Sequence, residues 1–230
     1  MDQPGCVSRE DMVGCLGGLE RVNRWLGGGS LTCRYAMPII RARYRETGKP
    51  IRICDIGTAS ADIPRVIISR ARREHIPIQI TAVELNADLA AEAEKLCREF
   101  PEITIKCADA REVLRAAGEH PFDLVTACLF THHFDPGEVE SWLMLMDAAA
   151  TCGWIINDLE RHPAAYCGIR LFGKLFSSNP VFLHDGSLSV RRAYSPAEWR
   201  AMIGTAGLQN ITINRHWAWR LIIAKDRFRS

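Results

Sequence analysis

The chain lacks several features that would place it in a common functional class. Its 230 residues carry a net charge of +2, which is too small to indicate nucleic-acid binding by itself. No apolar run approaches the roughly 18 residues needed to span a bilayer, so no stable membrane insertion is expected. The first residues include Asp2, Glu10 and Asp11 without the apolar stretch of a secretory signal. We therefore expect a cytoplasmic protein with no nucleic-acid partner.

Paired cysteines are also absent. The nine cysteines are spread along the chain as singles, and none has the Cys-x-x-Cys spacing typical of zinc and redox sites. An odd number of cysteines without a pairing framework is typical of a reducing compartment. No other group of residues has the spacing of zinc ligands. No metal site is therefore predicted.

Short apolar segments alternate with amphipathic segments from residue 51 onward. The alternation predicts an α/β protein with a Rossmann-like, doubly wound sheet of seven strands, six parallel and one antiparallel. The length suits one such domain with a full core. The expected strands cover residues 51–56, 78–83, 103–107, 122–129, 154–157, 211–216 and 219–224, and the last two form an antiparallel hairpin.

Two segments lie outside this alternation. Residues 1–50 precede it and are predicted to form an N-terminal helical lid, with a second helix that begins at Ser30 or Thr32. Residues 51–230 form the main domain, which contains an irregular, apolar, substrate-binding insertion at 158–194. Ordinary packing onto the sheet is the alternative role of the insertion. The N-terminal helices are expected to form a lid, a homodimer contact or both.

The first expected strand ends in a small-residue turn that favours a nucleoside-like ligand. The turn reads Asp55-Ile-Gly57-Thr-Ala59-Ser-Ala61, and a helix begins directly after it. It lacks the Gly-x-Gly-x-x-Gly of nicotinamide sites and the Gly-Lys-Ser/Thr of phosphate-binding loops. An acid at residue 55 repels a pyrophosphate and suits a cationic amino-acid group. A nicotinamide oxidoreductase is therefore disfavoured.

Two further acids follow the next two strands. Glu84 is placed to accept hydrogen bonds from ribose hydroxyls, and Asp109 to accept one from an adenine amino group. The carboxyl ends of parallel strands meet at one edge of a sheet, which is the usual ligand edge. An adenosyl ligand with an ammonium and a sulfonium, and without phosphate, satisfies this set of acids.

At these residues the chain resembles the class I S-adenosylmethionine (SAM)-dependent methyltransferases, over roughly residues 51–225. That family's first turn is Asp/Glu-x-Gly-x-Gly-x-Gly, whereas this chain has Ala59 and Ala61 at the second and third glycines. If the backbone there has a positive φ, each alanine costs about 1 kcal/mol. A Rossmann-like fold that has lost its ligand is the alternative. The resemblance implies SAM as cofactor, with a binding set of Asp55, Gly57, Thr58, Ala59, Glu84, Leu85, Asp109, Ala110 and Cys128.

The segment after the fourth strand is the expected position of the chemistry. It reads Leu-Phe-Thr-His132-His133-Phe, which lacks the Asn/Asp-Pro-Pro-Tyr/Phe of nitrogen methyltransferases and resembles small-molecule enzymes related to quinone-biosynthesis methyltransferases. An imidazole with a pKa near 6.5 suits the removal of a phenolic proton. His133 or His132 is therefore the candidate general base. The alternative is that one of them caps the following helix or packs under the adenine ring.

Four short motifs resemble bacterial small-molecule methyltransferases associated with type III polyketide synthases. They are Asn23-Arg-Trp-Leu-Gly-Gly, Leu-Phe-Thr-His-His-Phe, Asn-Asp-Leu-Glu-Arg and Asp-Gly-Ser-Leu-Ser-Val-Arg-Arg-Ala-Tyr. This resemblance implies O-methylation of a small apolar phenolic or polyketide-type metabolite in secondary metabolism. C-methylation of a quinone precursor and a non-catalytic adenosyl-binding scaffold remain as alternatives. The expected substrate contacts are Arg161, Tyr166, Phe172 and His184.

Overall fold

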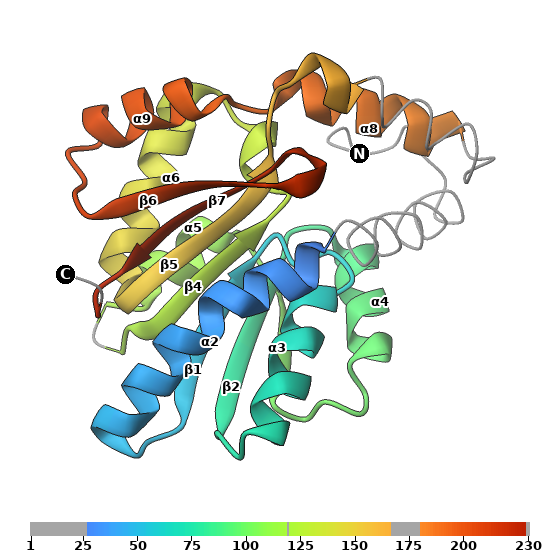
Figure 1. Cartoon of the computed structure of the whole chain (residues 1–230). Helices are drawn as coiled ribbons and strands as arrows, with labels where there is room; N and C mark the ends of the chain where they lie inside the picture. Colours follow the sequence, from blue (N-terminus) through green and yellow to red (C-terminus); the bar gives the residue numbers. More distant parts are fainter. Residues whose placement is uncertain (1–26, 119, 167–179, 229–230) are drawn as a thin grey trace.

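The computed structural model describes residues 27–118, 120–166 and 180–228 (Figure 1). Seven strands form one sheet in the order β3-β2-β1-β4-β5-β7-β6. Only β7 runs against the other six, because it pairs antiparallel with both β5 and β6. The predicted sheet of six parallel strands and one antiparallel strand is confirmed. The strands are β1 Ile51–Ile56, β2 Ile78–Glu84, β3 Ile103–Cys107, β4 Phe122–Cys128, β5 Ala150–Leu159, β6 Ile211–His216 and β7 Arg220–Asp226.

Helices cover both faces of the sheet and enclose two apolar cores (Figure 1). The first face carries α2 Gly28–Thr47, α3 Asp62–Arg73 and α4 Ala87–Leu96. The second face carries α5 Ala110–Ala116, α6 Pro136–Ala149 and α9 Pro196–Thr205, whose core includes Trp142, Trp154 and Trp199. None of the helices in the described part of the chain is long and apolar enough to cross a bilayer. The remaining short elements are α8 Pro180–Arg192 and the 3-10 turns η1 Thr131–His133 and η2 Trp217–Trp219.

Several helices begin where the sequence places a capping residue. The Asn86 side chain accepts hydrogen bonds from the backbone N–H groups of Asp88 and Leu89, at 2.9 and 3.2 Å. Ser195 and Glu198 form a capping box at the start of α9. These capping residues fix where the helices begin. The start of α4 at Ala87, for example, leaves Glu84 at the end of β2, on the ligand edge of the sheet.

The described part of the predicted N-terminal lid is α2, and it packs onto the sheet. It begins at Gly28, slightly before the predicted Ser30 or Thr32. Its Thr32, Ala36 and Ile40 are buried against the first core. This part of the chain therefore belongs to the helical layer of the main domain. The first predicted N-terminal helix falls within residues 1–26, which lie outside the described residues, so a lid there stays a prediction, as does the homodimer.

The predicted bounds of the fifth strand are wrong. Gly153 directly precedes the predicted strand 154–157, where a glycine is typical of the end of a helix, but it lies inside β5 with φ 144°. A Cβ on Gly153 would come within 2.0 Å of the Lys225 carbonyl oxygen, so glycine is needed there for the close approach of β7. The strand also continues through Leu159, and residues 180–192 form α8 instead of irregular chain.

Candidate functional site

The turn after β1 has the backbone of a glycine-rich turn. Gly57, Ala59 and Ala61 have φ values of 64°, 47° and 56°. All three are therefore in the left-handed region that favours glycine. The two alanines at the positions of the resembling family's second and third glycines are strained by about 1 kcal/mol each. The turn keeps its shape despite this strain, so other interactions hold it.

One of these interactions comes from Asp55, whose carboxylate is buried beneath the turn. Its Oδ2 accepts a hydrogen bond from Thr58 Oγ1 at 2.7 Å, and its Oδ1 accepts one from Thr126 Oγ1 at 2.5 Å. Burial raises the pKa of Asp55 to about 7, against the lowering effect of the hydrogen bonds from Thr126 and Thr58, and the Asp62 charge raises it further. Asp55 thus ties β1, the turn and β4 together and titrates near neutral pH.

Glu84 joins the turn to the end of β2. Its Oε2 accepts a hydrogen bond from the Ala59 N–H and its Oε1 one from the Asn86 N–H, both at 3.0 Å. The side chain of the next residue, Leu85, is 73% exposed and presents an apolar surface at this edge. The carboxylate retains lone pairs for two ligand hydroxyls. Glu84 and Leu85 therefore provide acceptors next to an apolar surface.

The remaining predicted cofactor residues lie at the ends of the neighbouring strands. Asp109 is half-buried and accepts a hydrogen bond from the Arg111 N–H at 2.8 Å, which caps α5, and Ala110 is buried. Cys128 ends β4 beside the turn, since β1 and β4 pair through Ile56 and Ala127. Burial raises the pKa of the Cys128 thiol to about 12. The fold thus gathers the predicted cofactor residues along one edge, and the thiol stays neutral.

Phe130 is a residue of this site that the sequence did not indicate. A Cβ built on Gly57 would lie 2.4 Å from Phe130 Cδ2, so the ring lies directly on the turn. The ring also packs against Phe134 and Trp142, with centroid separations of 4.9 and 5.0 Å. The glycine at residue 57 is required both by its positive φ and by this contact.

A buried histidine–aspartate pair lies just after β4 and at the end of β5. His132 Nδ1 is 2.7 Å from Asp158 Oδ1, and both side chains are almost fully buried. Asp158 Oδ2 accepts hydrogen bonds from Thr131 Oγ1 and from the backbone N–H groups of Thr131 and His132, at 2.5, 2.9 and 3.1 Å. The carboxylate therefore fixes both the imidazole ring and the turn that carries it.

The charge state of Asp158 follows from these contacts. Burial alone would raise the pKa of Asp158, but the facing His132 and the hydrogen bonds from His132, Thr131 and the Leu159 N–H together hold it well below its usual range. An ionised Asp158 accepts a hydrogen bond from Nδ1 of His132 and so fixes the orientation of the imidazole ring. His133, the other predicted base, is exposed, and its ring packs against the His132 ring at a tilt of 36° with a centroid separation of 4.3 Å.

The described part of the structure does not show the predicted substrate contacts gathered at one place. Arg161 is exposed and forms an ion pair with Glu198 Oε1 at 2.5 Å. Tyr166 is half-buried in the short helical segment that precedes residue 167. Phe172 lies outside the described residues, and His184 is described only by its place in α8. Their substrate role stays a prediction.

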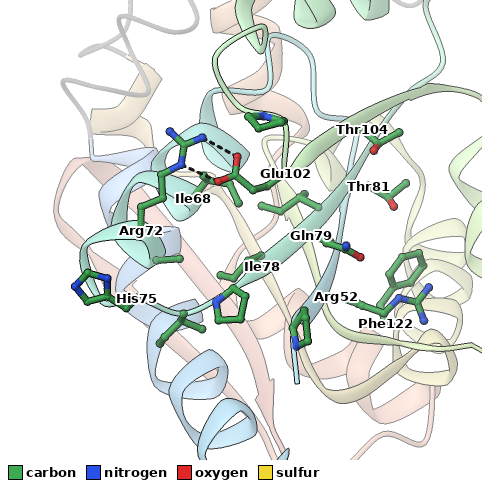
Figure 2. Close-up of a pocket in the computed structure, with 16 residues that line it drawn as sticks. Arg52, Ile68, Arg72, His75, Ile78, Gln79, Thr81, Glu102, Thr104 and Phe122 are labelled. Carbon is green, nitrogen blue, oxygen red and sulfur yellow. Dashed lines mark hydrogen bonds and ion pairs between the residues drawn. The ribbon is translucent and has the colours of Figure 1, made fainter. Parts of the chain in front are cut away.

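A groove of about 850 Å³ lies at the opposite edge of the sheet, near the amino ends of β1, β2 and β3 (Figure 2). Arg72 and Glu102 point toward each other there and share a two-pronged ion pair. The guanidinium carbon of Arg52 lies over the Phe122 ring, 5.4 Å from its centroid. These polar groups pair with one another and include no acid–base pair like that of His132 and Asp158. We therefore place the candidate site at the carboxyl edge. Within the described ranges there is no group of three or more His, Cys, Asp and Glu residues that could bind a metal.

Comparison with known proteins identifies the fold. No protein-family model and no curated protein matches the sequence. Human N-acetylserotonin methyltransferase in complex with SAM matches with a TM-score of 0.65 and 14% identity, over 96% of this chain and 56% of that one. The DszA carbon methyltransferase matches with a TM-score of 0.64 and 14% identity, over 87% of this chain and 53% of that one.

An O-methyltransferase family 2 protein from Planctomyces limnophilus, in complex with apigenin, gives a TM-score of 0.56 and 13% identity, over 79% of this chain and 51% of that one. The chain thus spans about half the length of the solved structures it matches. At these identities the likeness concerns the fold. The chain has the Rossmann-like fold of the class I SAM-dependent methyltransferases.

Proposed function

We propose that this protein is a SAM-dependent methyltransferase that O-methylates a small apolar phenolic or polyketide-type metabolite. The observation that carries the proposal is the buried His132–Asp158 pair at the carboxyl edge of the sheet, which joins the turn after β4 to the end of β5, and β4 is the strand next to β1 and its strained turn at Gly57. A base held by a buried carboxylate is suited to remove a hydroxyl proton. The O-methyltransferase family 2 protein among the structural neighbours supports this reaction class.

The side chains around the turn have the hydrogen-bonding and apolar groups that SAM needs. Glu84 would accept hydrogen bonds from the ribose hydroxyls, Leu85 would lie against the adenine, and Asp109 would accept from its amino group. The turn has no lysine for a phosphate, and the buried Asp55 disfavours one. When bound, SAM supplies a methyl group on a sulfonium, which is an electrophile for an oxygen or carbon nucleophile.

The protein's own part in the reaction is proton removal and alignment. Asp158 holds the Nδ1 proton of His132, so Nε2 has the lone pair that accepts the phenolic proton. The acceptor oxygen would keep the electron pair of its O–H bond and use it to form the bond to the methyl carbon, while the methyl–sulfur bond would break with its electron pair going to sulfur, so that neutral S-adenosylhomocysteine would be the leaving group. The proton passes from Nε2 to water after transfer. Because His132 is buried, the proton moves in a site of low polarity, where the pairing with Asp158 stabilises the imidazolium.

C-methylation of an activated ring is the second candidate reaction. It is supported by two further neighbours, the DszA carbon methyltransferase and the citrinin polyketide synthase CMeT domain. The same His132 would remove the proton of the acceptor, which leaves the two reactions distinguishable only by the atom that receives the methyl group. Carbon-13 NMR of a product labelled from methyl-labelled SAM separates them, because methoxy and ring methyl carbons differ widely in chemical shift.

Isothermal titration tests the proposal most directly. We expect S-adenosylhomocysteine to bind and NADH not to bind. Incubation with methyl-labelled SAM and a panel of phenols should transfer one labelled methyl group, and His132→Gln should lower that rate by roughly 10²-fold or more, with His133→Gln as the matched control. Binding of NADH without S-adenosylhomocysteine would exclude the proposal. Binding without turnover on any phenol or activated ring would instead favour a non-catalytic scaffold.

A further inference from the structure

Two tryptophans lie exposed on η2, the short turn that joins β6 to β7. Trp217 and Trp219 are 71% and 37% exposed, whereas Trp142, Trp154 and Trp199 are buried. Contact of so much aromatic surface with water is unfavourable, and apolar side chains that gather at one exposed place are typical of a binding surface. The η2 turn therefore presents a compact aromatic surface that a ligand or partner would cover.

The turn lies at the carboxyl edge of the sheet, next to the strand end that holds the proposed base (Figure 1). Asp158, the partner of His132, pairs with Leu221 in the antiparallel ladder of β5 and β7. Two residues after Asp158, the Glu160 N–H donates a hydrogen bond to the Trp219 carbonyl oxygen at 2.7 Å. The backbone of η2 is therefore attached to the chain just beyond the His132–Asp158 pair.

The backbone of the η2 turn is strained. Ala218 and Trp219 have φ values of 60° and 52°, both in the left-handed region. Glycine and asparagine occupy this region readily, whereas a bulky residue such as tryptophan rarely does. Backbone strain of this kind is found where the direction of a side chain matters for function. We infer that the strain is retained because it sets the direction in which the Trp219 indole leaves the turn.

Neighbouring elements hold the turn from two sides. On the side of α2, His216 Nε2 lies 2.9 Å from the Tyr35 hydroxyl oxygen, and the two rings meet edge to face. On the side of the chain that follows β5, the His162 ring lies nearly parallel to the Trp219 ring, with a centroid separation of 6.1 Å. The aromatic surface is therefore preorganised, which lowers the entropic cost of binding a ligand.

The strand order places the turn opposite the predicted cofactor residues. Asp55, Glu84 and Asp109 lie at the ends of β1, β2 and β3, on one side of β4, whereas η2 lies beyond the ends of β5 and β7, on the other side. The short η1 turn that carries His132 follows β4, between the two groups. A donor over β1 to β3 and an acceptor at η2 would therefore meet at the proposed base.

We propose that Trp217 and Trp219 bind the aromatic ring of the methyl acceptor by stacking, an inference that rests on the proposed function. A planar ring gains both apolar burial and ring–ring contact on an indole, whereas a saturated ring of similar size gains burial alone. The three residues of the turn, Trp217, Ala218 and Trp219, carry no charge, which suits a neutral phenol better than an anionic acceptor. The turn thus selects planar, neutral acceptors.

Binding of two probe alcohols tests this assignment without turnover. 2-Naphthol and decahydro-2-naphthol are similar in size and carry the same hydroxyl group, but only 2-naphthol is planar and aromatic. Both are titrated by calorimetry into wild-type protein, Trp217→Leu, Trp219→Leu and the control Phe228→Leu. Phe228 is another exposed aromatic side chain, and it lies beyond the opposite end of β7. We expect wild type and Phe228→Leu to prefer 2-naphthol by about 3- to 10-fold.

The preference should fall to within about twofold in Trp217→Leu and Trp219→Leu and should be largely retained in Trp217→Phe, with the affinity for S-adenosylhomocysteine nearly unchanged in all three. A wild-type protein that binds the two alcohols equally, or binds neither, would overturn the inference without any variant. So would a preference that survives in both leucine variants.

Sedimentation of the same proteins tests a second copy of the chain as the occupant. A wild-type dimer that dissociates in Trp217→Leu would assign the turn to an interface between copies and overturn the inference. Titration with S-adenosylhomocysteine tests the proposed function separately. Failure of wild type to bind it would overturn the proposed function whatever the two alcohols show, whereas its binding without a preference for 2-naphthol would overturn only the role of the tryptophans.

Discussion

At the residue scale, the turn after β1 makes a prediction about strain. Ala59 and Ala61 both have a positive φ, but Ala59 is half-buried whereas Ala61 is fully buried in the first core. Ala59→Gly should raise the free energy of unfolding by about 0.5–1 kcal/mol because the left-handed strain is removed. Ala61→Gly should change it little, since the relief of strain is offset by about 0.8 kcal/mol for the buried methyl group. Urea denaturation measures both, and a more stabilising Ala61→Gly would contradict this account.

The buried Asp55 predicts a pH dependence of stability. Its pKa is raised to about 7 in the folded protein, against about 3.9 in an unfolded chain. Between these values the unfolded state releases a proton that the folded state keeps, so folding is favoured at low pH. The contribution is full below pH 4 and is lost as the pH rises through 7, by a free energy on the order of 4 kcal/mol.

The variant Asp55→Asn removes this group while it keeps a similar shape. Its stability should fall less than that of wild type between pH 5 and pH 8, as measured by urea denaturation at both values. Other titrating groups contribute equally to both proteins, so the difference between them isolates Asp55. Parallel pH profiles would mean that Asp55 is ionised in the folded protein throughout this range.

Asp158 predicts a loss of rate without a loss of binding. Asp158→Asn removes the charge that fixes the Nδ1 proton of His132 and leaves a side chain of the same size. We expect kcat to fall by roughly 10²- to 10⁴-fold, with the affinity for S-adenosylhomocysteine within about threefold of wild type. Steady-state kinetics and titration test the two parts. Equal losses of rate and affinity would instead indicate a structural role.

The residues of the site were predictable to different degrees. The ends of β1, β2 and β3 were visible as acids after apolar runs, which is why Asp55, Glu84 and Asp109 were assigned to one edge. The partner of His132 was not visible, because Asp158 is on a different strand and meets it only through the pairing of β4 with β5.

At the scale of elements, the pattern of apolar runs predicted most strands and helices but not their exact ends. Gly153 looked like the end of a helix, because glycine is common there. It is instead a strand residue that lets the Lys225 carbonyl approach, and no local pattern records that contact. Residues 180–192 lie in the segment that was predicted to be irregular. Pro180 at the first position and Arg191 in the last turn favour the helix that forms.

The link between β5 and α2 predicts an element-specific loss of stability. The Asn157 amide joins the two through Gly28 and Thr32 in a fully buried position. Asn157→Ala should lower the free energy of unfolding by about 2 kcal/mol, because two buried acceptors on α2 lose their donor. Hydrogen exchange should quicken first in the opening turn of α2. The exposed Gln209→Ala is the control, and unchanged exchange in α2 would contradict the role given to Asn157.

At the scale of the whole molecule, the strand order explains why the site lies where it does. The chain runs outward from β1 through β2 to β3, and then returns to the other side of β1 with β4 and β5. The helices that follow β1 and β4, α3 and α6, consequently leave to opposite faces (Figure 1). Ligands of doubly wound sheets bind in the crevice that this reversal opens. Gly57 and Phe130 lie at this point of reversal, just after the ends of β1 and β4.

Ligand binding at this crevice should stabilise the entire domain by mass action. S-adenosylhomocysteine at 100 times its Kd should raise the free energy of unfolding by about 2.7 kcal/mol, or Tm by roughly 5–10 °C for a chain of this length. NADH should leave Tm unchanged.

Two glycines with nearly the same φ provide a matched pair of variants, since Gly57 has φ 64° and Gly48 has φ 63°.

Gly48→Ala introduces left-handed strain where no atom lies within 4 Å of the new Cβ, whereas Gly57→Ala adds the same strain and places its Cβ 2.4 Å from Phe130. Both variants should lose about 1 kcal/mol from the backbone, and Gly57→Ala more, because the ring must shift. Only Gly57→Ala should also lose most of the ligand-induced rise in Tm, since the turn and the ring that border the crevice move apart. A full ligand response in Gly57→Ala would mean that the ligand binds away from the turn, even if the fold is that of a methyltransferase.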